Sequence, residues 1–203
     1  MARATITDPV RNFKFQVTIN ATGNLQTQTQ GLDKIGFAVV SGLSVQNEMV
    51  GYREGGMNTH PHKFIGQSDF APITFSRGVF SGQDQLYKWQ QFLHAWNQGS
   101  GTGTIGSTST ANNYRCDILV KVFDHPVSAG SYSTPGATDG VAPSPGNARL
   151  AFKLFDCFPA AYSLSDLDAS GSGIMVQQLT VHHEGFVVAW NSEDITALAG
   201  AGG

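Results

Sequence analysis

Short segments in which apolar and polar residues alternate with a period of two recur along the 203-residue chain. This alternation is typical of β-strands that bury one face. The first segment carries Phe13, Phe15, Val17 and Ile19, separated by polar residues. Others follow at residues 37–49, 64–80, 114–124, 148–158 and 174–188, and no internal repeat relates them. The sequence therefore predicts a mainly β fold, an antiparallel β-barrel or sandwich whose closed or nearly closed sheet leaves few free edges.

Two of these segments predict one long antiparallel hairpin that spans Phe37 to Phe80. They flank a turn-rich stretch from Gly51 to His62. The hairpin arms exceed the about 5–6 residues of an ordinary strand. Pro72 lies in the returning arm, and because proline has no amide hydrogen it indicates an edge position or a bulge there.

One α-helix is predicted between Ser81 and Gly99. Ser81 and Asp84 are spaced as in a weak capping box, and Gly99 is a natural end of the helix. Large apolar residues then repeat at helical spacing: Leu86, Trp89, Leu93 and Trp96. We expect this face to flank the sheet as part of the core, since such a stripe is more often core than a cofactor site.

The remaining segments predict loops within a single domain that covers residues 1–203. Residues 1–12 form an N-terminal arm and residues 21–34 a polar loop. Residues 99–113 and 125–147, rich in Gly, Ser and Thr, are loop insertions. Residues 192–203 are a small-residue tail that we expect to be mobile unless a neighbour fixes it.

Charged residues make up only 13% of the chain, about half of the usual share. The low content of charged residues, together with 24 glycines, fits two alternatives. One is a surface covered by copies of the same chain, and the other is an ordinary β-rich domain with long polar loops. The net charge of −3 indicates no general nucleic-acid binder, which normally carries a basic patch.

Cysteines and the N-terminus bear on where the protein is made. The chain has only two cysteines, Cys116 and Cys157, and they lie far apart in the sequence. This fits a reducing cytosol and no disulfide framework. The first residues do not resemble a signal peptide, and no apolar run approaches the about 18 residues of a membrane span. We expect a soluble protein that is made inside the cell and leaves it by lysis or within a particle.

Several motifs that could carry chemistry have a simpler interpretation. The G-x-G-x-x-G match at residues 101–106 follows a helix and precedes a strand, the reverse of a dinucleotide site. The pairs His60/His62 and His182/His183 lack metal-site spacing, and adjacent histidines on a strand point to opposite faces. Ser163, Ser165, Asp166 and Asp168 are ordinary turn residues. We therefore expect no catalytic residue, no cofactor and no metal, and so no enzyme.

Specific blocks of sequence resemble the tail-tube family of contractile phages. Residues 8–15 (DPVRNFKF) are similar to the family's start, and residues 37–43 to its F-x-x-V-S-G-L segment. The most specific block is the Y-R-E-G-G-x-N turn at residues 52–58. Residues 73–78 (ITFSRG) and the L-x-x-x-H-E-G-F block at residues 179–186 follow in the family's order, with Trp89 in the helix between them. The resemblance extends to extracellular contractile injection systems and, more distantly, to the type VI secretion tube.

This resemblance implies a structural subunit that assembles as rings of six, stacked into a hollow tube inside a contractile sheath. It implies no membrane partner. The partners would be copies of the chain, the sheath, the baseplate hub, the tail terminator, and DNA or effector protein passing through the lumen. The location would be a virion tail or an extracellular injection particle, assembled in the cytoplasm of the host or producer cell.

The expected interface residues lie on the long hairpin. For the contact between rings we expect the turn formed by Tyr52, Arg53, Glu54, Gly55, Gly56 and Asn58. For the lumen lining we expect Ser44, Gln46, Glu48, Thr74 and Ser76. Two alternatives stay open: a tail-terminator or tube-initiator ring protein, and a monomeric β-barrel binding module or enzyme.

Overall fold

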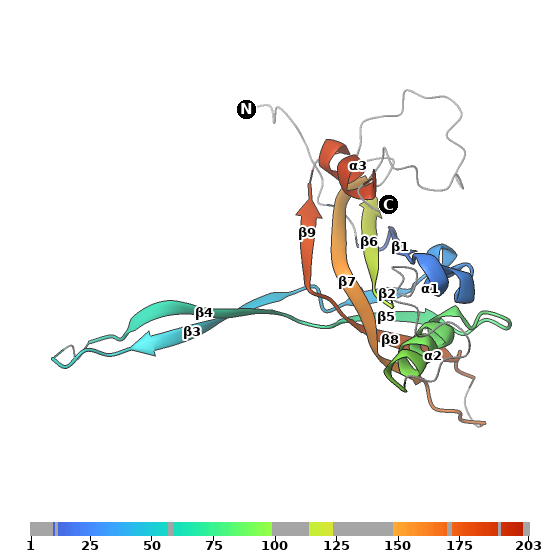
Figure 1. Ribbon diagram of the computed structural model, residues 1–203, viewed down its shortest axis with the longest axis horizontal. Coiled ribbons are helices and arrows are strands. Elements are labelled where there is room, and N and C mark those ends of the chain that lie inside the picture. The colour runs from blue at the N-terminus through green and yellow to red at the C-terminus, as the bar shows by residue number, and fades with distance from the viewer. Residues whose placement is uncertain are drawn as a thin grey trace.

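The computed structural model describes residues 10, 12–56, 59–98, 114–123, 148–169, 172–190 and 192–200. Most of these residues lie in antiparallel strands, so the mainly β prediction is confirmed (Figure 1). In chain order the elements are β1 (Phe15–Asn20), α1 (Gly23–Gln28), the 3-10 turn η1 (Leu32–Lys34), β2 (Val39–Ser41), β3 (Val45–Tyr52), β4 (His62–Phe70), β5 (Ile73–Gly78), α2 (Gln85–Gln98), β6 (Cys116–Phe123), β7 (Ala148–Leu164), β8 (Val176–His182), β9 (Gly185–Ala189) and α3 (Ser192–Gly200).

The main sheet has the strand order β1-β6-β7-β8-β5-β2, and β9 pairs with β7 as well. The 17-residue strand β7 joins two halves of this sheet, because its first part pairs with β6 and β9 and its last part with β8. Between the two parts, Asp156 adopts a left-handed φ of 51°, which aspartate tolerates better than most residues. The register also shifts between Pro159 and Ala161. These irregularities accompany the bend of β7 seen in Figure 1.

The inner faces of the two halves pack together and form the larger hydrophobic core. Val17, Ile118 and Leu154 come from one half, and Phe75 and Leu179 from the other. The stripe of α2 covers this core, with Leu86 and Trp89 buried as predicted. Trp89 also donates a hydrogen bond from Nε1 to the backbone oxygen of Tyr114, 3.2 Å away.

The sheet is not closed into a barrel within the residues described. β1 and β2 end the strand order and do not pair with each other. The expectation of a closed or nearly closed sheet was therefore wrong in this respect, and the sandwich alternative describes the molecule better. β2 has only three paired residues, which is too short to continue the sheet around to β1.

Residues 192–200 of the predicted C-terminal tail form the helix α3. Ile195 of α3 is fully buried, in a second core with Leu119 and Phe123 of β6 and Ala151 of β7. These strand residues point away from the first core. The helix therefore covers the outer face of this half of the sheet.

The stretch 21–34 is also ordered, contrary to the loop prediction. It holds α1 and η1, and Leu25 and Leu32 from these turns are buried in the larger core. The predicted insertions at 99–113 and 125–147, and all of the arm at 1–12 except Val10 and Asn12, lie outside the described residues.

Cys116 and Cys157, far apart in the sequence, are register partners on β6 and β7. Both are free thiols, and both are buried. Burial raises the pKa of each thiol, that of Cys157 to about 12.

Candidate assembly interface

The most unusual feature is a two-stranded ribbon, β3–β4, that projects from the main sheet (Figure 1). It is the outer part of the predicted long hairpin, whose base is the pair β2–β5 in the main sheet. All eight residues of β3 are exposed, and in β4 only Gly66 and Phe70 are partly covered. Among the described residues, no other strand pairs with either arm. Both outer edges of the ribbon therefore present backbone groups that a neighbouring chain can pair with.

The ribbon carries exposed apolar side chains on both of its faces. Met49 faces Ile65 across the strands, and the next pair is Val50 with Phe64. Successive residues of a strand point to opposite faces, so these two pairs lie on different sides. Their exposed fractions run from 50% for Val50 to 88% for Ile65. An isolated two-stranded hairpin is marginally stable in water, and this one would need cover on both sides.

A bulge interrupts the ribbon between Asn47 and Met49. A Cβ on Gly66 would come within 2.9 Å of the Glu48 oxygen, closer than real Cβ atoms approach. Glycine is thus required where the strand passes the bulge. The hydroxyl of Ser68 donates to Asn47 Oδ1 over 2.7 Å and closes this irregular part of the ladder.

The ribbon leaves the main sheet at a joint formed by Gly42 and Pro72. Gly42 has a φ of +100°, and a Cβ there would lie 2.4 Å from the Pro72 oxygen. Pro72 stands between β4 and β5, where the ladder is interrupted, which is the kind of position that the sequence predicted for it. The glycine of the V-S-G-L block is therefore explained by backbone geometry.

The base of the ribbon is anchored by the bend between β8 and β9. His183 lies there, 8% exposed, with Nε2 at 3.2 Å from the Ala71 oxygen. Phe70 packs its ring against His183 and Phe186, at centroid distances of 5.6 and 6.0 Å. His182 is exposed while His183 is buried, so the opposite orientation predicted for this pair is confirmed. The H-E-G-F block therefore holds the base of the hairpin in place.

The hairpin tip, which we define as residues 50–56 and 59–65, contains most of the expected ring contact. Tyr52, Arg53, Glu54, Gly55 and Gly56 are all exposed, whereas Asn58 lies outside the described residues. The Arg53 and Glu54 side chains make no hydrogen bond or ion pair with other described residues. The assignment of this turn to a contact between rings stays a prediction.

The expected lumen residues fall into two groups. Thr74 and Ser76 lie on the face of β5 opposite the core, whereas Ser44, Gln46 and Glu48 lie on the hairpin. The strand registers place Thr74 and Ser76 in a surface that we call the polar face, made of Val39, Ser41, Thr74, Ser76, Ala161, Ser163, Gln178 and Thr180. Thr74 and Thr180 share a hydrogen bond of 3.3 Å between their hydroxyls. None of these eight residues is charged.

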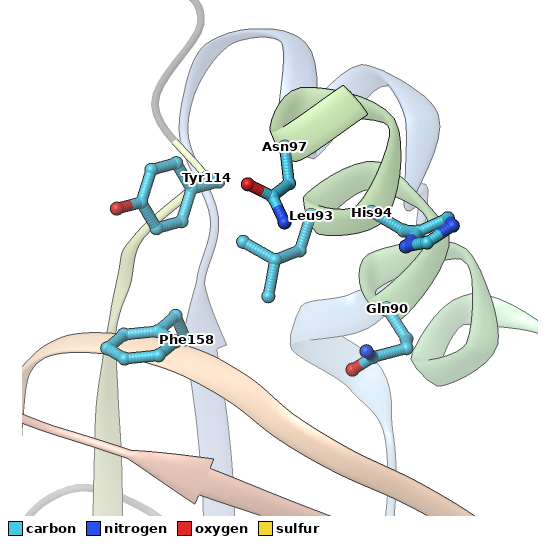
Figure 2. Close-up of a pocket in the computed structure, with 6 residues that line it drawn as sticks. All are labelled: Gln90, Leu93, His94, Asn97, Tyr114 and Phe158. Atoms are coloured by element: carbon cyan, nitrogen blue, oxygen red, sulfur yellow. The ribbon is translucent and has the colours of Figure 1, made fainter. Parts of the chain in front are cut away.

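A cleft of about 380 Å³ lies between α2 and the sheet (Figure 2). The side chains of Leu93 and Asn97 on α2 face Tyr114 and Phe158 across it, and Gln90 and His94 complete the lining. The Arg115 guanidinium stacks over the rings of Tyr114 and Phe158 and pairs with Glu184. Among the described residues, the lining contains no serine, cysteine, lysine or carboxylate.

The described residues contain no group of three or more side chains suited to hold a metal ion. Within the same part of the chain, no helix is long and apolar enough to cross a bilayer. The G-x-G-x-x-G match at residues 101–106 lies outside it.

Comparison with known proteins gives a consistent result. A family model described as T4-like virus tail tube protein gp19 matches residues 11–187. No curated protein matches the chain.

The solved structures that share the fold include the following three. One is the PVC sheath–tube complex of an extracellular contractile injection system, at 21% identity and a TM-score of 0.59 over 90% of this chain and 93% of that one. The others come from the anti-feeding prophage. The match to its tube-terminating cap has 20% identity and a TM-score of 0.61, and it covers 94% of this chain and 97% of that one. The match to its six-fold symmetrised baseplate has 16% identity and a TM-score of 0.61, and it covers 91% of this chain and 97% of that one.

Proposed function

Because the chain belongs to the tail tube protein family of T4-like viruses, we propose that it is a subunit of an inner tail tube, built from stacked rings of six copies. The observation that carries this proposal is the β3–β4 ribbon, with two unpaired edges and apolar pairs on both faces. Copies of the same chain can cover both features. Strand addition by a neighbour forms hydrogen bonds with the unpaired edges, and packing between neighbours buries the apolar pairs on the faces. The ring size of six agrees with the symmetry of the baseplate structure that shares the fold.

The polar face is our candidate for the wall of the central channel. The α2 helix covers the opposite, core side of this half of the sheet, which leaves the polar face open to a lumen. Neutral hydroxyl and amide groups hydrate well but offer no cationic contact to phosphate. Such a wall lets DNA or an effector protein pass without binding it. The outside of the tube would face the sheath, with the baseplate hub and terminator at its ends.

The test of this function is the mass and shape of the purified protein. We expect a species of about 130 kDa, six times the 21.6 kDa chain, and hollow tubes under negative stain as the concentration rises. Arg53→Glu should stop tube growth while the circular dichroism spectrum stays that of the folded chain. A strict monomer at high concentration contradicts the proposal, and normal tubes from Arg53→Glu contradict the role of the turn.

A second candidate is a ring that caps a tube without stacking. The solved cap of the anti-feeding prophage has the same fold as the PVC tube chain, so the fold itself serves both roles. The same micrographs separate the two candidates. Single rings that never stack support the cap, and tubes support the tube subunit.

A further inference from the structure

The hairpin tip needs a docking surface on the next copy, and a second group of exposed apolar side chains offers one. It lies on the turn between β7 and β8, which we call the β7–β8 turn and define as residues 164–169 and 172–175. Leu164, Leu167 and Ile174 are 47%, 84% and 83% exposed there. The end of β5 adjoins this turn, because the Val79 amide donates to the Met175 oxygen over 2.9 Å. Phe80, 59% exposed, follows Val79 directly and extends the apolar surface.

The turn is held in a defined shape by backbone hydrogen bonds. The Ser165 amide donates to the Val176 oxygen over 2.8 Å, and the Val176 amide donates to Ser165 Oγ over 3.1 Å. Leu167 and Ile174 therefore lie just beyond the hydrogen-bonded pair Ser165 and Val176, on the two sides of the turn. Side chains that are more than four-fifths exposed on such a turn indicate a contact surface.

The charges of the two surfaces are opposite. The turn carries two exposed carboxylates, Asp166 and Asp168, and no cation among its described residues. The hairpin tip carries Arg53 and Lys63 against the single carboxylate of Glu54. Apolar side chains stand beside the charges on both surfaces: Leu167 and Ile174 on the turn, and Phe64 and Ile65 on the tip.

The two surfaces lie at opposite ends of the molecule. In Figure 1 the ribbon extends far to the left, whereas β5 and the β7–β8 connection end at the lower right. One chain cannot join these two surfaces to each other. A contact between unlike surfaces at opposite ends is heterologous, and it generates a filament when the repeated contact does not close into a ring.

We propose that the β7–β8 turn of one copy is the docking surface for the hairpin tip of a copy in the next ring. This inference rests on the proposed tube function and adds the receiving surface to it. Leu167 and Ile174 cover Ile65 of the tip, which lies on the same face of the ribbon as Lys63, and Asp166 and Asp168 face Arg53 and Lys63. The opposite charges fix the direction of stacking.

The experiment is a charge exchange followed by electron microscopy and sedimentation. The turn variant is Asp166→Lys with Asp168→Lys, and the tip variant is Arg53→Glu with Lys63→Glu. Each alone should lose at least nine-tenths of the pelletable tubes, on the order of a tenfold weaker contact, while rings remain. The two variants mixed, or all four changes in one chain, should restore tubes because every tip again meets an oppositely charged turn.

Matched controls make the outcome decisive. The control variant Asp33→Lys with Glu193→Lys changes the net charge by the same amount as the turn variant, but at exposed residues outside the turn. It should form normal tubes. Leu167→Ser with Ile174→Ser tests the same surface without a change of charge and should also stop stacking. Normal tubes from the turn variant, no rescue by the four changes, or tube loss in the control overturn the docking surface. If the unmodified chain forms no rings or tubes, the tube function itself fails.

Discussion

At the scale of single residues, glycines fix the path of the hairpin. Gly42 combines a φ of +100° with a Cβ position that would lie 2.4 Å from the Pro72 oxygen, so both conformation and space exclude a side chain. Gly51, in the middle of the same hairpin, has no atom within 4 Å of its Cβ position. These two glycines share a residue type but differ in what the fold requires of them.

The first prediction compares these positions. Gly42→Ala should lower the free energy of unfolding by about 1–3 kcal/mol through backbone strain and the clash with Pro72. Gly51→Ala should stay within about 0.5 kcal/mol of the unmodified chain. Urea denaturation of both variants measures the difference. Equal stability of the two variants would show that the joint is not constrained as described.

The second prediction concerns Cys116 and Cys157, whose buried thiols have raised pKa values. Above about pH 8.5 the thiols of the unfolded chain ionise while the native thiols stay protonated, so the native state binds more protons. The free energy of unfolding should then fall with rising pH, with a slope that approaches about 1.4 kcal/mol per unit for each thiol as the unfolded chain becomes fully ionised. Urea titrations from about pH 8 to about pH 9.5 measure this slope. Cys157→Ala should reduce it, and an unchanged slope contradicts the burial of that thiol.

Sequence reasoning reached some residue roles and missed others. The opposite orientation of His182 and His183 followed from strand parity, because adjacent residues of a strand face opposite sides. The pairing of Cys116 with Cys157 was out of reach, since the register between β6 and β7 depends on a bulge beside Asp156 that no local pattern encodes. Pairing across a long intervening segment is a tertiary property.

At the scale of elements, long alternating segments were predicted well and short turns were not. The hairpin and α2 each carry several repeats of their period, and both were found. In contrast, α1 and α3 are short, and few of their residues are large and apolar: Leu25 in one, Ile195 and Leu198 in the other. Their helical structure depends on packing against strands, which local propensity does not reveal.

The third prediction tests whether both faces of the ribbon are covered in the assembly. Met49→Gln with Ile65→Gln alters one face, and Val50→Gln with Phe64→Gln alters the other. All four side chains are at least half exposed in the single chain, so we expect little change in the thermal midpoint of either variant. Each variant should nevertheless stop ring or tube formation, as seen by sedimentation. Full assembly by one of them would show that only the opposite face is in contact.

At the scale of the whole molecule, low charge and an open sheet have a common explanation. A sheet that ends at β1 and β2, with a separate ribbon, leaves more backbone and apolar surface exposed than a monomeric domain usually tolerates. Composition left two alternatives open, a surface covered by copies of the chain and an ordinary β-rich domain with long polar loops. The exposed ribbon favours the first. The sequence could not show that the sheet stays open, because closure depends on how the strand ends meet in space.

The last prediction concerns hydrogen exchange of the backbone amides in β3 and β4, measured on dilute chain and on the assembled particle. We expect fast exchange in the dilute chain, where the ribbon stands alone, and strong protection after assembly, when neighbouring chains pair with its edges. The amides of the buried strand β6 serve as the internal reference and should be protected in both states. Ribbon amides that exchange equally fast in the assembled particle would contradict the completion of this sheet by neighbouring copies.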